Sequence, residues 1–234
     1  MIIPGANAAV DEKFALSQLV RACNAGGSSS GSSGSTAGFT ILCLQNEIPI
    51  ETTFAAMLYA SQNNIRCIYN PAPAPTMTRQ TLLRKLRDNQ VDIIVPNETE
   101  LAAITGLPTD TEEDVEDAAR FLLNECACRA VVVTRGSRGA YLLADGIESE
   151  GDISRFIGTD KVIAVDTTGA GDSFIGSLAA HMSNGASINE AVTAAIFIAS
   201  QSVLEQGAQA SYSGVRELDE QYWPTFRGAR EEYA

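Results

Sequence analysis

Histidine and basic side chains are scarce in this chain. One of its 234 residues is a histidine, His181, and 16 Lys or Arg stand against 29 Asp or Glu, which gives a formal net charge of −13. A single histidine argues against histidine-based catalytic triads and histidine-rich metal sites. The few cations form no cluster, so the chain also lacks the basic face that a nucleic-acid-binding protein needs.

Paired cysteine motifs and long apolar runs are missing as well. The five cysteines are odd in number and include no pair of CxxC units, which argues against a zinc site. No apolar run is long enough to span a membrane, and the first residues lack the basic-then-apolar pattern of a secretory leader. We therefore expect a soluble cytoplasmic protein with reduced thiols.

Apolar stretches alternate with helical patterns along most of the chain. Strands are expected at 39–45, 65–70, 91–96, 129–135, 139–144 and 161–166, and helices at 11–25, 50–63, 78–88, 97–105, 111–125, from about 170 to Gly185, and from Ser187 to about Leu204. Continuously apolar strands separated by helices of this length are typical of βαβ units. The pattern predicts an α/β fold with a doubly wound, mostly parallel sheet in a Rossmann-like, three-layer αβα arrangement.

Polar, glycine-rich or proline-rich motifs follow the predicted strands. In chain order they are QNEIP, NPAPAP, NETE, TRGSRG and DTTGAGD. Ligands of open α/β sheets bind outside the carboxyl ends of the strands. We therefore expect these five motifs to contribute to one site.

The motif DTTGAGD (166–172) places two glycines and an aspartate at the expected start of a helix. Gly169, Ala170 and Gly171 would aim backbone N–H groups at one point and form an anion hole with the helix dipole. Asp172 beside an anion hole fits a general base that takes a proton from a hydroxyl during phosphoryl transfer. A second interpretation, equally open from this motif alone, is that Asp172 only caps the helix.

The longer stretch DTTGAGDSF resembles the carboxy-terminal signature of the ribokinase-like (PfkB) carbohydrate kinases. PNETE (96–100) and VVVTRGSRGAYLL (131–143) are similar to two further motifs of that family, and LQNEIP, NPAPAP and PGAN (4–7) to the ribose-specific branch. The resemblance covers nearly all of residues 1–213. It implies ATP-dependent phosphorylation of a sugar primary hydroxyl, with D-ribose as the sugar and D-ribose 5-phosphate as the product.

The resemblance also implies roles for single residues. Asp172 would be the base beside the anion hole, and Glu47 would hydrogen-bond the sugar, although an exposed loop glutamate is the alternative. Asn97 would bind ATP phosphates and Glu100 would bind Mg²⁺ through water, the alternative being a simple helix-capping pair. The nucleotide would also contact Thr134, Arg135, Gly136, Ser137, Arg138, Gly139 and Gly171.

A monovalent cation, usually K⁺, is the third cofactor that the resemblance implies. Its ligands would be Asp166, Thr168, Ser202, Glu205, Gly207 and Ser211, several of them through backbone carbonyls. One departure lies in the adenine pocket, where ribokinases commonly carry an asparagine and this chain has Ile196.

The larger departure is that the family's first third, with its sugar-gripping aspartate and its lid, has no counterpart before Met1. We expect a single truncated domain over residues 1–234 that lacks several strands, with a flexible Gly/Ser-rich insertion at 26–38 and a possible homo-oligomer. Two alternatives to a ribose kinase stay open. The chain could be a nucleotide-binding remnant or truncated gene product, or its substrate could be fructose, a nucleoside or another small alcohol.

Overall fold

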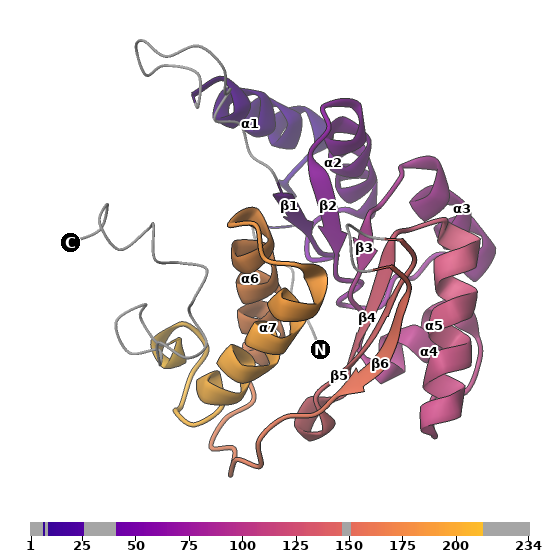
Figure 1. The fold of residues 1–234 in the computed structure, drawn as a ribbon. Coiled ribbons are helices and arrows are strands. Elements are labelled where there is room, and N and C mark those ends of the chain that lie inside the picture. Colours follow the sequence, from indigo (N-terminus) through magenta and orange to yellow (C-terminus); the bar gives the residue numbers. More distant parts are fainter. Residues whose placement is uncertain (1–6, 8, 26–40, 147–150, 213–234) are drawn as a thin grey trace. The chain divides into compact units, whose positions relative to one another are not determined.

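The computed structural model describes residues 7, 9–25, 41–146 and 151–212, shown in colour in Figure 1. They belong to two compact units, residues 1–131 and 132–234. Residues 4–6 of the PGAN motif and the predicted insertion at 26–38 lie outside the described residues. None of the helices in the described part of the chain is long and apolar enough to cross a membrane.

The strands form one six-stranded sheet in the order β1-β2-β3-β4-β5-β6. Their bounds are Ile41–Leu44, Arg66–Tyr69, Ile93–Ile94, Ala130–Thr134, Ala140–Ala144 and Ile153–Ile157. β1 to β4 pair in parallel, and β5 and β6 are antiparallel with Ala140 opposite Ile157. The predicted α/β fold with a mostly parallel sheet is thereby confirmed, and the described strands follow one another in chain order.

Five helices belong to the first unit. They are α1 (Glu12–Ala25), α2 (Ile50–Gln62), α3 (Arg79–Asp88), α4 (Glu98–Thr105) and α5 (Glu112–Cys126). α3, α4 and α5 pack on one another, whereas α1 packs on α2, which also contacts β1 and β2. The shortest strand, β3, is fully buried at Ile93 and Ile94, which explains its continuously apolar sequence.

The second unit contains a helix pair and the turn between β4 and β5. α6 (Ala170–Ser183) packs along α7 (Ile188–Ser202), and α7 also contacts β5. The predicted capping box of α7 is present, with Ser187 at the N-cap and Glu190 three residues on. Two 3₁₀ turns, η2 (Gly136–Arg138) and η3 (Gln209–Ser211), complete the unit's described elements.

The prediction of a strand at 161–166 is wrong. This segment belongs to no sheet, and its apolar side chains Ile163 and Val165 are 90% and 66% exposed. The N–H groups of Val165 and Asp166 both donate to the carbonyl of Val203, at 2.8 and 3.3 Å, instead of to a neighbouring strand. An apolar sequence makes a strand only where another strand supplies a hydrogen-bonding ladder, and the prediction could not test that condition.

Candidate functional site

A cavity of about 560 Å³ lies in the second unit, and two of the predicted motifs form part of its wall. Of the predicted nucleotide residues, those that line it are Thr134, Gly136, Ser137, Gly139 and Gly171, together with Ala170 of the predicted anion hole. The rest of the lining is Thr159, Asp160, Lys161, Val162, Ala164, Thr167, Phe174, Ile196, Ala199, Ser200 and Val203. A concave, largely apolar space with a few polar groups is typical of a small-ligand site.

The turn after β4 aims only some of its residues at this cavity. Arg135 and Arg138 are not among the lining residues. Arg135 is buried, and its guanidinium stacks on the ring of Phe156 in β6, 4.6 Å from the centroid. The bond from Arg135 N to Gly139 O, 2.8 Å, closes the turn. Arg135 thus joins the turn to the edge strand, a packing role that the motif alone did not indicate.

The wall formed by α7 is apolar. Ile196, Ala199 and Val203 face the cavity, and Ser200 donates its hydroxyl to Phe197 O of its own helix at 2.6 Å. An apolar surface suits an aromatic base better than it suits a sugar, whose hydroxyl groups need hydrogen-bonding partners.

The start of α6 forms the polar end of the same cavity. Gly169 is the N-cap residue with φ +82°, and the first intrahelical bond runs from Ser173 N to Gly169 O at 2.9 Å. The N–H groups of Ala170, Gly171 and Asp172 therefore precede the helical ladder. Ala170 N already donates to Thr167 O at 3.3 Å, so Gly171 supplies a better-placed donor for an anion.

Asp172 is exposed at the third position of α6, next to the cavity-lining Gly171. Since the N-cap is Gly169, Asp172 is not the N-cap residue that the alternative interpretation required. A carboxylate in the first turn still interacts favourably with the helix dipole. Its exposure leaves it accessible to a hydroxyl substrate.

Three of the six candidate cation ligands meet where the chain enters α6. Asp166 accepts from Thr168 N and Gly207 N, both at 2.9 Å, one on each carboxylate oxygen. These backbone hydrogen bonds, with that from Thr168 first, hold the pKa of Asp166 below its usual value. Each oxygen keeps a second lone pair. The structure thus brings Asp166, Thr168 and Gly207 together, whereas the hydroxyls of Ser202 and Ser211 donate to carbonyls of their own segments.

Within the described ranges, no three His, Cys, Asp or Glu side chains come together in a way that could hold a metal ion. A donor set with one carboxylate, that of Asp166, is weakly charged, which fits a monovalent cation better than a tightly held divalent one. For Mg²⁺, a single carboxylate acting through water also fits, because that ion keeps most of its waters and binds mainly to substrate phosphates.

Asn97 and Glu100, which lie in the first unit, form a complete capping box at the start of α4. The Asn97 side chain accepts from Glu100 N at 2.8 Å, and a Glu100 carboxylate oxygen accepts from Asn97 N at 2.9 Å. The capping interpretation is therefore confirmed, and it leaves open an added role in binding. Burial raises the pKa of Glu100, against the opposing effect of its hydrogen bonds from Asn97.

We expect Asn97→Ala to lower the free energy of unfolding by about 1 kcal/mol, because it removes one N-cap acceptor. Thr111→Ala is a matched control, since Thr111 forms the same box with Asp114 at the start of α5. If Asn97 also binds phosphate, only Asn97→Ala weakens Mg²⁺-ATP binding, by about tenfold. Denaturant unfolding and calorimetric titration of both variants measure this, and equal ATP affinity in the two would leave Asn97 as a cap alone.

Glu47 is exposed in the loop after β1. Its neighbour Asn46, which the motif analysis missed, joins the two first-unit loops QNEIP and NPAPAP. Asn46 donates to Ala72 O and Pro73 O and accepts from the Tyr69 hydroxyl, each at 2.9 Å. The sequence does contain a signal for this contact, because an asparagine follows each of the neighbouring strands β1 and β2, as Asn46 and Asn70. The loop that carries Glu47 is thus anchored, whereas the Glu47 side chain reaches solvent.

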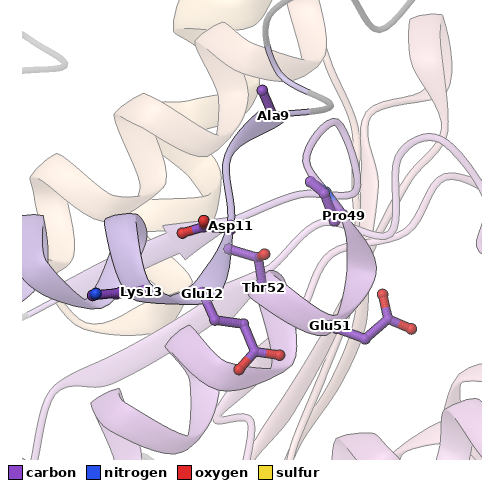
Figure 2. A pocket seen from close by; sticks show the side chains of 7 residues that line it. All are labelled: Ala9, Asp11, Glu12, Lys13, Pro49, Glu51 and Thr52. Carbon is purple, nitrogen blue, oxygen red and sulfur yellow. The ribbon is translucent and has the colours of Figure 1, made fainter.

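A second hollow in the first unit, about 590 Å³, lies between the start of α1 and the start of α2. Figure 2 shows that its carboxylates, Asp11, Glu12 and Glu51, point in different directions. Asp11 is used locally, because it accepts from Phe14 N at 2.7 Å. We assign this hollow no chemical role.

Comparison with known proteins identifies the family. The family described as pfkB family carbohydrate kinase matches residues 7–213. The chain belongs to this family. Similar proteins include a deoxyribokinase of Salmonella typhi, 34% identical over 183 residues, which are 77% of this chain and 55% of that protein.

Solved structures give the same family. The crystal structure of ribokinase from Thermotoga maritima matches with a TM-score of 0.70 at 31% identity. The match covers 96% of this chain and 64% of the ribokinase chain. Arabidopsis thaliana ribokinase complexed with ribose and ATP also has a TM-score of 0.70, at 28% identity, with 97% of this chain and 64% of its own chain covered. This PfkB chain spans about half the length of the curated relatives it matches.

Proposed function

We propose that this PfkB-family chain carries out ATP-dependent phosphorylation of the primary hydroxyl of a pentose, with D-ribose as the first candidate. The observation that carries the proposal is the second-unit cavity, which joins the TRGSRG turn, an apolar wall on α7 and the first turn of α6. The cavity combines an apolar surface for the adenine base with a helix start that can bind the phosphates. A nucleotide requires this combination.

The chain's own residues supply most of the chemistry of this reaction. The adenine base of ATP would lie against Ile196 and Val203, and the N–H group of Gly171 and the dipole of α6 would stabilise negative charge on the transferred phosphoryl group. Asp172 would accept the proton of the attacking sugar hydroxyl, with the hydroxyl oxygen attacking the terminal phosphorus of ATP and ADP leaving. Mg²⁺, which the resemblance assigns to Glu100 through water, would neutralise phosphate charge.

A monovalent cation near Asp166 and Gly207 would offset the carboxylate charge close to the anion hole. Potassium is the candidate, as the sequence resemblance implies. The other predicted ligands lie in the loop before α6, as Thr168 does, or at and after the end of α7, as Ser202, Glu205 and Ser211 do. The cytoplasmic location and self-association also remain predictions from the sequence.

A second candidate function is a nucleotide-binding protein without sugar turnover. It is favoured by the scarcity of sugar ligands, because Glu47 and Asp172 are the two that we assign among the described residues, and both are exposed. The identity of the sugar is a separate question. The deoxyribokinase relative makes 2-deoxy-D-ribose the natural competitor of D-ribose.

The test is ADP release by the purified 234-residue chain with Mg²⁺-ATP. It is run without sugar and with D-ribose, 2-deoxy-D-ribose or fructose, in K⁺ and in Na⁺ buffer. We expect pentose-dependent turnover that is at least severalfold faster in K⁺. ATP binding without turnover on any sugar would establish the second candidate, and faster turnover on the deoxy sugar would change the substrate but not the reaction.

A further inference from the structure

Tyr212, directly after η3, lies against the N-cap residue of α6. Its hydroxyl donates to the carbonyl oxygen of Gly169 at 3.0 Å. A Cβ atom on Gly169 would lie 2.5 Å from the Tyr212 hydroxyl oxygen and 2.8 Å from the Ala208 Cβ. The tyrosine therefore fills the space that the missing side chain of Gly169 leaves, and this contact was not predicted from any sequence motif.

Gly169 needs an external restraint because of its backbone conformation. Its φ of +82° is in the left-handed region, and glycine moves between positive and negative φ with little energetic cost. The peptide that joins Gly169 to Ala170 sets the direction in which the following N–H groups point. Its carbonyl oxygen accepts two hydrogen bonds, one from Ser173 N inside α6 and one from Tyr212. Together they fix the plane of that peptide.

The same segment holds the loop at a second point. Gly207 N donates to the Asp166 carboxylate at 2.9 Å. The Tyr212 hydroxyl bonds to Gly169, which is three residues after Asp166. The two threonines of DTTG lie between these attachment points. The segment from Gly207 to Tyr212 thus braces the loop before and after its turn, and only the second attachment depends on a single side-chain hydroxyl.

The Tyr212 hydroxyl is the hydrogen-bond donor in its contact with Gly169. Burial, and to a smaller extent the charge of Asp172, raise the pKa of Tyr212 above its usual value. An ordinary phenol is already protonated at neutral pH, so the hydroxyl is available as a donor without this shift.

We propose that Tyr212 is a positioning residue: its hydroxyl holds the Gly169 peptide so that the first-turn N–H groups of α6 are preorganised for a phosphoryl group. The consequence for turnover rests on the proposed kinase function. The consequence for the order of the loop does not. A hydrogen bond of this kind changes a local equilibrium by about threefold to tenfold.

The test compares Tyr212→Phe with Tyr141→Phe in the full chain. Both variants remove one hydroxyl in the second unit, and Tyr141 is a matched control because its hydroxyl pairs with Ser154 at 3.0 Å between β5 and β6. The first measurement is amide hydrogen exchange at residues 170–173, with the buried amides of β5 as an internal standard. The second is kcat and the KM for ATP with the preferred sugar.

In Tyr212→Phe we expect exchange at 170–173 to become about threefold to tenfold faster and kcat to fall by a similar factor, with the KM for ATP within about twofold. Tyr141→Phe should change neither. Unchanged exchange at 170–173, or an equal increase across β5, would overturn the proposal. If the wild-type chain phosphorylates no sugar, the proposed function fails, and the exchange measurement still decides the role of Tyr212.

Discussion

Replacing Asp172 by asparagine should lower the rate of sugar phosphorylation by about a hundredfold to ten-thousandfold while ATP affinity stays within about twofold. Asparagine has nearly the same shape but cannot accept the proton of the attacking hydroxyl. Because Asp172 lies beside the second-unit cavity and is not part of its lining, the change leaves the walls of that cavity in place. Stopped-flow or coupled-enzyme kinetics give the rate, and calorimetric titration with a non-hydrolysable ATP analogue gives the affinity.

The control for Asp172→Asn is Asp117→Asn, which removes one exposed carboxylate from α5 and changes the net charge equally. It should leave both rate and affinity unchanged. If Asp172 serves only the helix dipole, Asp172→Asn would instead lower the free energy of unfolding by about 0.3–1 kcal/mol and reduce rate and affinity together. That result would remove the general base from the proposed mechanism.

The second large effect is expected from Gly139→Ala, which should destabilise the chain by about 3 kcal/mol and abolish measurable ATP binding. Gly139 has φ +84° and ψ −128°, a backbone conformation open essentially to glycine alone. An added Cβ would collide with the carbonyl oxygen of Ile157, which is backbone and cannot rotate away. Ile157 is paired with Ala140, so relief of the clash must separate β5 from β6.

Gly136→Ala is the matched control, because Gly136 lies in the same turn and lines the same cavity. Its φ is +55°, yet an added Cβ would meet no atom within 4 Å. We expect only the cost of a left-handed alanine, about 1–2 kcal/mol. Urea unfolding separates the two variants. Equal losses would mean that the edge strand β6 moves aside at little cost and that the backbone contact at Gly139 is not a constraint.

Much of the fold could be predicted because local sequence decides it. The bounds of α2 to α5 are within one residue of their predicted positions, since caps such as Asn97 and Thr111 act within one turn of the helix. Strands β2, β4 and β5 were equally clear, because most of their continuously apolar residues are buried in the sheet. The Gly-rich start of α6 was predicted from residue types that permit positive φ and a close approach of the backbone.

The edge of the sheet could not be predicted in this way. ISRFI forms β6 although two of its five residues are exposed, whereas the more apolar KVIAVD forms no strand. The difference lies in the partner. β6 pairs along the whole of β5, and the backbone of Val165 and Asp166 is instead bound to Val203. Hydrogen bonding to a distant segment overrides local β-propensity.

The sequence by itself determined which residue types meet at the candidate site, because glycines, a carboxylate and helix caps have chemical properties that do not depend on distant contacts. The tertiary structure decided which of them face the cavity and which brace it. It assigned Arg135 to packing on Phe156, tied Asp166 to Gly207, and placed Tyr212 against Gly169. Each of these contacts joins segments far apart in the chain or on separate elements, and only the packing of the folded chain brings such residues together.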